Sequence, residues 1–253
     1  MNVLTLGLNV FKRHRSKKAF WILMIVFFLL IVANYVIAGV QKESVVGADV
    51  ADFIWGNSLT VPVFCLLLSI AFAQNSVSYE INKSTIHLIL ARPVSPEECM
   101  AGMYLGSLVS ILVPYLILSL VSFAGMAAVA GSYLTEALIA IVMFAIPVVL
   151  MTVLVTFFSS WMPGSFAGLT GFALFIFSFF SANIDSVAGR VNLAYRIPLR
   201  FINLFSLRLD AFFDQVRAVI MGYGVAWRPL VWEVGYAIII VALGVYLFRF
   251  RKV

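Results

Sequence analysis

The sequence contains few charged residues. Asp, Glu, Lys and Arg make up 11% of the 253 residues, whereas a soluble domain carries about 25%. Hydrophobic residues make up 63% of the chain, and the mean hydropathy is +1.08. This composition predicts an integral membrane protein. Because each membrane-crossing helix takes about 20 apolar residues, six crossings would leave no room for a soluble enzyme domain.

The sequence also lacks the motifs of nucleotide and metal chemistry. It has no G-x-x-x-x-G-K-[ST] loop to hold nucleotide phosphates, no H-E-x-x-H and no G-x-S-x-G. Its two histidines, His14 and His87, lie apart, and Cys65 and Cys99 are too distant along the chain to predict a disulfide. We therefore expect no metal site, no cofactor bound by this chain and no enzymatic activity of its own. The net charge of +6 indicates cytoplasmic flanks and lipid headgroups as partners, and no nucleic acid.

Apolar runs predict an all-α membrane protein with six transmembrane helices in one transmembrane domain, residues 1–253. Residues 2–18 begin apolar and end basic, which predicts an amphipathic helix in the membrane interface. Lys and Arg concentrate before the first span, after the second span and at the C-terminus. We therefore expect both termini to be cytoplasmic, in a plasma membrane such as a bacterial inner membrane. The predicted spans are about 19–39, 57–79, 100–129, 135–157, 166–183 and 229–248.

The segment before the last span, residues 184–228, is rich in arginine although it should lie outside. From Arg196 onward its polar residues recur every three or four positions, as one stripe on a helix, and only Arg208 falls off the stripe. A spanning helix would place charges at midspan, at a cost of about 2.5 to 3.5 kcal/mol each. We therefore predict an interfacial or re-entrant helix, whose charged stripe comprises Arg196, Arg200, Asp210, Asp214 and Arg217.

A segment of the second polar loop, residues 80–103, carries a specific pattern. It reads EINKSTIHLILARPVSPEECMAGM, with an acidic residue followed by Thr85, several apolar residues, and then Arg92, Pro93, Val94 and Ser95. This segment resembles the loop after the second span of type-2 ABC permeases, the membrane subunits of ATP-driven exporters. Gly102 also matches the family pattern. The sequence departs from that pattern at Ser84, Pro96 and Met103.

The loop has a plausible local structure. A short cytoplasmic helix near residues 85–90 would end at Arg92 and Pro93, and Pro96 with two acidic residues would open the next helix. The resemblance implies that this coupling helix fits a separate ATP-binding subunit, which would hold ATP and Mg, and that two permease copies, or one copy and a homologous chain, work together. An ordinary amphipathic loop helix is the alternative. The residues expected at the ATPase contact are Glu80, Lys83, Thr85, Ile86, His87, Leu90, Arg92, Pro93, Glu97 and Glu98.

A few polar and small residues interrupt the apolar spans. In the resembled family, spans two and five flank the central route, which makes four polar residues there weak candidates for lining it. Hydrogen bonding between helices explains them equally well. These four residues are Ser69, Gln74, Thr170 and Ser178.

Two further features of the spans have structural explanations. Gly164, Gly168 and Gly171 form a small-residue face that permits close helix packing, either within the chain or between two copies. Glu233 is the acidic residue nearest a span interior, and we expect it to lie near the outer interface within reach of Arg228.

The sequence favours a permease over three other functions. A self-sufficient secondary transporter or channel would need ionisable residues at midspan or an inverted repeat. Spans one to five carry almost no charge, and no repeat is visible in the sequence. An intramembrane enzyme would need an assembled nucleophile, base or metal set. A purely structural or sensory membrane protein is the remaining alternative, and the spans do not identify a substrate.

Overall fold

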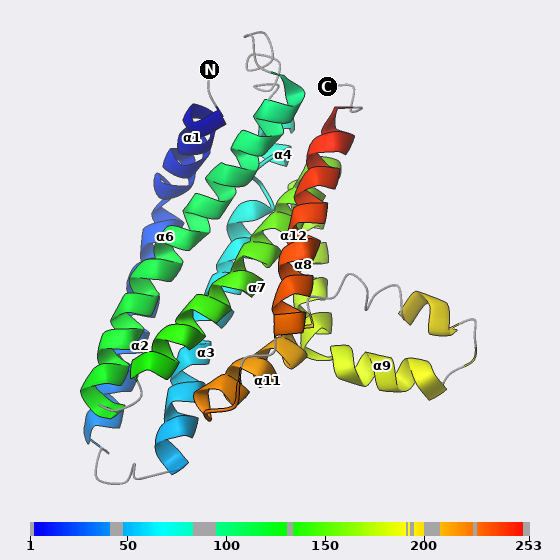
Figure 1. The fold of residues 1–253 in the computed structure, drawn as a ribbon. Helices are drawn as coiled ribbons and strands as arrows, with labels where there is room; N and C mark the ends of the chain where they lie inside the picture. Colours follow the sequence, from blue (N-terminus) through cyan, green and yellow to red (C-terminus); the bar gives the residue numbers. More distant parts are fainter. Residues whose placement is uncertain are drawn as a thin grey trace.

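The structure, a computed structural model, is helical throughout the residues that it describes and has no strand among them (Figure 1). Five helices in this part of the chain are long and apolar enough to cross a membrane, which supports a multi-pass membrane protein. They are α2 (Lys18–Val40), α3 (Ala48–Ala73), α6 (Pro96–Ala130), α7 (Leu134–Trp161) and α12 (Trp227–Phe248). The described residues are 3–40, 48–82, 95–130, 134–190, 192, 195–199, 208–224 and 227–249.

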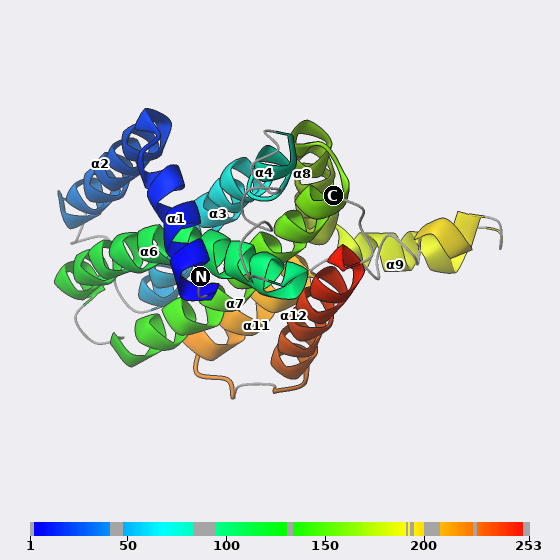
Figure 2. The same ribbon diagram turned by 90° about the horizontal axis from the view of Figure 1, so that it is seen from above.

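The fifth predicted span, at 166–183, is not confirmed as a membrane-crossing helix. The apolar helix found there, α8 (Gly164–Phe179), has 16 residues. At 1.5 Å per residue it is about 24 Å long, shorter than the hydrocarbon core of about 30 Å. The chain turns at Phe180, whose N–H bonds to the Phe177 carbonyl, and continues as the polar helix α9 (Ser181–Arg190). In Figures 1 and 2, α9 extends sideways from the bundle.

Both ends of the chain lie at the same end of the bundle (Figures 1 and 2). The N-terminal helix α1 (Val3–Arg15) packs beside the start of α6, and the short α4 (Ser78–Asn82) lies nearby. Arg249, which follows α12, lies 3.7 Å from Glu97 at the start of α6. We call this end the α4 end. The opposite end, where α11 (Leu209–Ile220) crosses α3 and α7, is called the α11 end.

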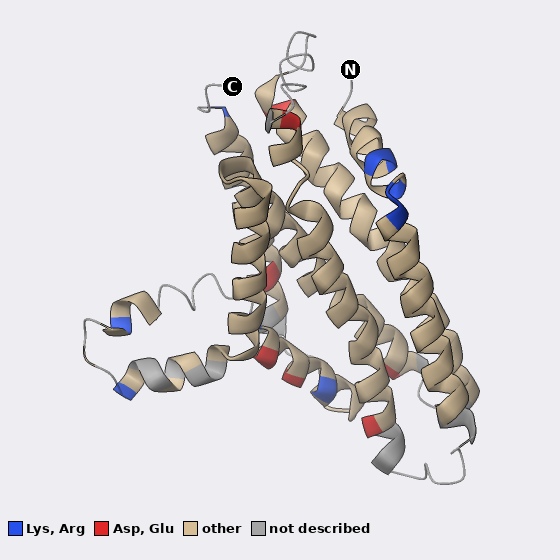
Figure 3. Ribbon diagram, turned by 180° about the vertical axis from the view of Figure 1, so that it is seen from behind, with Lys and Arg blue, Asp and Glu red and all other residues tan. Residues whose placement is uncertain are grey.

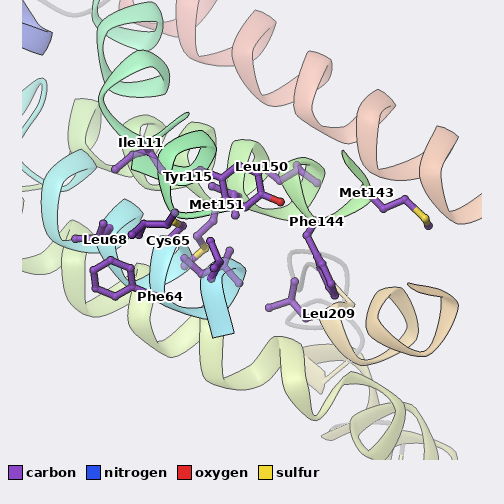
Figure 4. Close-up of a cluster of buried hydrophobic side chains, with 14 of the residues drawn as sticks. Phe64, Cys65, Leu68, Ile111, Tyr115, Met143, Phe144, Leu150, Met151 and Leu209 are labelled. Carbon is purple, nitrogen blue, oxygen red and sulfur yellow. The ribbon is translucent and has the colours of Figure 1, made fainter. Parts of the chain in front are cut away.

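The buried core lies mainly between α3, α6 and α7. Cys65 of α3, Tyr115 of α6 and Met151 of α7 have almost no exposed surface. Figure 4 shows these side chains together, with Leu209 of α11 near Phe144 at one side of the cluster. The outward faces of α2, α8 and α12 carry many exposed large hydrophobic residues instead. Apolar side chains on both the inner and the outer side of a helix are typical of membrane proteins.

Charged residues are largely confined to the two ends of the bundle (Figure 3). The helix α6 has 35 residues, which is about 52 Å of helix, so it extends well beyond a hydrocarbon layer of about 30 Å. Its first turn carries Glu97 and Glu98, and α1 packs against this helix. This arrangement gives the α4 end a polar layer in which side chains of different helices meet.

Candidate functional site

The loop predicted to contact an ATPase connects α4 to α6, so its flanking residues define the candidate site. Glu80 lies in α4, and Glu97 and Glu98 lie in the first turn of α6. The other seven predicted contact residues lie outside the described part of the chain, and their role stays a prediction. They are Lys83, Thr85, Ile86, His87, Leu90, Arg92 and Pro93.

Glu80 is joined to the N-terminal helix. Its carboxylate forms an ion pair with Arg13 of α1, and both side chains are largely buried. A second guanidinium nitrogen of Arg13 donates to the Ser76 carbonyl over 3.1 Å, and its Cζ lies 4.9 Å from the centre of the Tyr79 ring. Burial lowers the pKa of Arg13, and Glu80 opposes that effect. Arg13 thus binds α1 to the chain directly before the predicted coupling loop.

The start of α4 is held from a third helix. The Ser159 hydroxyl, near the end of α7, accepts hydrogen bonds from the backbone N–H groups of Val77 and Ser78, at 3.3 and 3.2 Å. These N–H groups belong to the turn and first residue of a new helix, where no intrahelical acceptor is available. Ser159 therefore supplies a cap from a helix remote in sequence and fixes the break between α3 and α4.

The glycines of α8 pack against the same break. A Cβ atom at Gly164 would overlap the side chain of Asn75, and one at Gly168 would overlap the side chain of Gln74. At Gly171 a Cβ would come within 2.7 Å of Val155 in α7. The small-residue face of α8 is therefore used for packing within the chain, one of the two uses that the sequence left open.

The N-terminal helix docks onto a row of small residues in α6. A Cβ at Gly106 would lie 2.6 Å from the Gly7 carbonyl, and one at Gly102 would lie 2.6 Å from the Leu6 Cβ. Such distances are possible only because both positions in α6 are glycine. The sequence interpretation missed this seam, although the spacing Gly102, Gly106, Ser110 was a visible signal.

His14 completes the seam between α1 and α6 and has no exposed surface. Its Nδ1 lies 3.0 Å from Ser110 Oγ, and that hydroxyl donates to the Gly106 carbonyl over 2.6 Å. Because the Ser110 proton is used, His14 Nδ1 must carry the proton that it donates to Ser110. Burial, followed by the charges of Arg13 and Lys17, lowers the pKa of His14 to about 3. The ring is therefore neutral at physiological pH.

The start of α6 confirms the predicted helix opening at Pro96. The Ser95 hydroxyl accepts a hydrogen bond from the Glu98 N–H at 3.2 Å, and Glu98 in turn accepts from the Ser95 N–H at 3.0 Å. This reciprocal pair is a capping box. Glu97, the residue before Glu98, faces Arg249, which follows α12. The two acidic residues therefore have different local contacts.

The four weak candidates for the transport route have contacts within the chain. Ser69 donates to the Cys65 carbonyl and lies 3.0 Å from the Thr152 hydroxyl of α7. Ser178 donates to the Leu174 carbonyl. Gln74 packs on Gly168, and Thr170 lies 4.0 Å from the Met162 sulfur. Hydrogen bonding and packing account for these residues, so lining a route stays a prediction for them.

At the α11 end, the structure corrects the predicted continuous helix. Arg196 lies in a helical stretch whose described residues are 195–199, whereas α11 begins at Leu209. Arg208, the residue that fell off the polar stripe, has a left-handed φ of 44° and breaks the helical path directly before α11. Arg200 lies outside the described residues.

The predicted amphipathic pattern holds within α11. Its buried face is formed by residues such as Phe212, Phe213 and Val216, and Asp214 and Arg217 are exposed. Asp210 accepts a hydrogen bond from the Ala211 N–H and one from Ser181 of α9. Arg217 pairs with Asp52 of α3 over 3.0 Å, and both side chains are about half exposed.

Glu233 is more buried than expected, with 6% of its surface exposed. It lies on α12 near the α11 end, and Arg208 is a positive charge that acts on it. The predicted contact with Arg228 falls on a side chain outside the described set. The described residues also contain no cluster of three or more metal-ligating side chains.

Comparison with known families covers almost the whole chain. A family model described as "ABC-2 family transporter protein" matches residues 9–253. The match includes the glycine seam of α6 and the flanks of the predicted coupling loop. No curated protein matches the chain.

Proposed function

Because the chain belongs to the ABC-2 transporter family and is a membrane permease of an ABC transporter, we propose that a separate ATP-hydrolysing subunit drives it from the α4 end. That subunit would hold ATP and Mg, since the chain has no P-loop of its own. In the working complex the permease forms the export pathway with a second copy or with a homologous chain. The α4 end would face the cytoplasm of a bacterial cell and carry both termini.

The observation that carries this proposal is the set of bonds around the loop. On one side of the loop, α4 is joined to α1 by Arg13 and to α7 by Ser159. On the other side, the start of α6 carries its own cap and faces the end of α12 through Glu97. A movement imposed on residues 83–94 would therefore reach α1, α7 and α12 through short contacts. These contacts support the proposal that the loop couples the permease to an external ATPase.

ATP binding can drive transport only if it favours one of two permease states. We propose that closure of the ATPase subunits displaces the loop, and that α4 and the start of α6 follow it as rigid units. The seam between α1 and α6, built from glycines, would move as one body because its backbones are in direct contact. The weakly polar contacts between α3 and α7, such as Ser69 with Thr152, then shift in register and open the outward route.

The sixth crossing also belongs to this proposal. α7 and α12 both end at the α4 end, so the chain must return to the other end between them. α8 makes this return. Gly164, at its start, contacts the α3–α4 break, and the ring centre of Phe179, at its end, lies 5.5 Å from that of Phe213 in α11. We propose that α8 with the turn at Phe180 crosses a locally thinned bilayer, and that α9 and α11 lie in the outer interface.

The first test is to express the tagged chain together with its neighbouring genes and to ask whether an ATP-binding protein purifies with it. We expect an ATPase subunit to purify with the chain at one copy per copy, and Ile86→Pro to release it because proline breaks the predicted loop helix. Arg217→Glu, at the α11 end, is the matched control and should leave the complex intact. A chain that purifies alone and moves solutes without ATP would instead support a secondary transporter.

A further inference from the structure

The N-terminal region has an unbalanced positive charge. No Asp or Glu precedes Glu43, whereas five basic residues lie between positions 12 and 18. Arg13 is paired with Glu80. Among the described residues, no acidic side chain forms an ion pair with the other four, which are Lys12, Arg15, Lys17 and Lys18.

The free positive charges lie beside exposed apolar side chains. Leu4 is 70% exposed and Leu8 is 54% exposed. With a helical period of 3.6, Leu4, Leu8 and Arg15 share the face of α1 that is turned away from α6. The indole of Trp21 donates to the Arg15 carbonyl over 2.9 Å and is itself half exposed. One surface therefore offers two leucines, a tryptophan and several cations.

The seam with α6 fixes this surface in place. Gly7 and His14, on the other face of α1, are buried against α6, so the helix cannot rotate its leucines inward. The surface also lies at a membrane boundary, because the first candidate span begins at Lys18. Tryptophan and lysine side chains collect at such boundaries.

The electrostatics favour an anion at this surface. Burial lowers the pKa of Lys17, and the charge of Arg13 lowers it further. His14 is subject to the same positive field. The described part of the chain supplies no acidic partner for the basic residues on the exposed face of α1 and at the start of α2, so a negatively charged group would be attracted there.

We propose that the surface formed by Leu4, Leu8, Lys12, Arg15, Lys18 and Trp21 binds an anionic phospholipid, with the headgroup on the cations and an acyl chain along the leucines. A soluble acidic partner would satisfy the charges but would leave the leucines without an apolar contact. Each basic residue near an anionic membrane surface strengthens binding about fivefold. The inference does not depend on an ATPase partner, because it concerns residues on the exposed face of α1.

The test uses the full chain in zwitterionic detergent and titrates phosphatidylglycerol or phosphatidylcholine with brominated acyl chains. Bromine quenches a nearby indole, and the difference between the wild-type chain and Trp21→Phe isolates the Trp21 signal. We expect phosphatidylglycerol to quench Trp21 at a concentration at least tenfold lower than phosphatidylcholine. The triple change K12Q/R15Q/K18Q should remove this preference, and Arg15→Gln alone should weaken it about fivefold.

A matched control separates a site from a general charge effect. R190Q/R196Q/R217Q removes the same number of positive charges away from α1 and should leave Trp21 quenching unchanged. Equal quenching by the two lipids, or equal losses in the two triple variants, would overturn the proposal. A triple change in α1 that left lipid quenching intact and released a protein partner would assign the surface to that protein and also overturn it.

Discussion

The two ends of the bundle are held together by different contacts. At the α4 end, ion pairs, hydroxyl caps and glycine contacts join α1, α4, α6, α7 and α12. At the α11 end, aromatic rings join α3, α7, α8 and α11. Phe213 lies 5.5 Å from both Phe144 and Phe179 and 6.5 Å from Trp55, as measured between ring centres. The ion pair that joins α11 to α3, Arg217 with Asp52, is about half exposed. Hydrogen bonds are directional, whereas the hydrophobic effect that holds apolar side chains together is not.

This difference suggests that the α4 end transmits movement between helices, whereas the α11 end mainly stabilises the fold. A displacement at the α4 end passes between helices because backbone carbonyls and caps are in direct contact there. At the α11 end, burial of apolar surface holds the helices together without fixing one geometry. We therefore expect changes at the α11 end to lower the free energy of unfolding, and changes at the α4 end to affect coupling as well.

The largest effect on stability should come from Phe213→Ala. The ring is 7% exposed and lies against three other aromatic rings. Large-to-small changes of this kind cost about 3 to 5 kcal/mol. Phe177→Ala, at a ring that is 40% exposed, is the control and should cost far less. Unfolding in mixed detergent micelles measures both, and similar losses would show that the aromatic cluster does not stabilise this end.

The seam at the α4 end should be nearly as sensitive, through overpacking. Gly106→Ala places a methyl group 2.6 Å from the Gly7 carbonyl, and such crowding costs about 1 to 3 kcal/mol. Gly235→Ala has open space around it and should be neutral or stabilising by up to about 1 kcal/mol. The same unfolding experiment compares them. If both variants behave alike, α1 is not docked on α6 as described.

His14 should make the seam sensitive to acid. Its pKa is about 3 in the folded chain and about 6.5 when unfolded. The unfolded chain therefore binds the proton first, and stability is complete above pH 6.5 and falls as the pH drops toward 3. At pH 5 the loss is about 2 kcal/mol relative to pH 8. His14→Phe should flatten the unfolding free energy between these pH values, and an unchanged slope would contradict a buried neutral ring.

The ion pairs Arg13–Glu80 and Arg217–Asp52 give the smallest expected effect but the most direct comparison of the two ends. A charge-assisted hydrogen bond contributes about 1.5 to 3 kcal/mol, so a double-mutant cycle on Arg13 and Glu80 should give a coupling energy near 1.5 kcal/mol. Exposed pairs contribute about 0.2 to 1 kcal/mol. The cycle on Arg217 and Asp52 should therefore give a coupling energy of about 0.2 kcal/mol or less. Equal coupling energies would remove the distinction between the two ends.

Several features could be predicted from the sequence because they depend on local pattern. The apolar runs indicated α2, α3, α6, α7 and α12, and Pro96 followed by two acids indicated the start of α6. The helix break before α11 was not predicted. The only indication of this break in the sequence is Arg208, the one charged residue off the stripe. The left-handed backbone conformation of Arg208 could not be predicted from its residue type.

The contacts between distant segments could not be predicted from one sequence. Gly102 and Gly106 indicate that another helix can pack closely against α6. Nothing in α6 specifies that this helix is α1, with Gly7, rather than a helix of a second copy of the chain. The same limit applies to Glu80, whose expected contact was an ATPase and whose observed partner is Arg13. The fifth predicted span differs for another reason, since the sequence does not mark the turn at Phe180 that ends α8 at Phe179.

The most direct test of the central claim compares two tyrosines, one at each end. Tyr79 of α4 is 38% exposed and Tyr223, after α11, is 69% exposed. The photo-crosslinking residue p-benzoylphenylalanine replaces either one with a similar aromatic side chain, in the chain purified with its ATPase subunit. The account predicts a crosslink to the ATPase from position 79 and none from position 223. A crosslink from position 223 alone, in an intact complex, would contradict it.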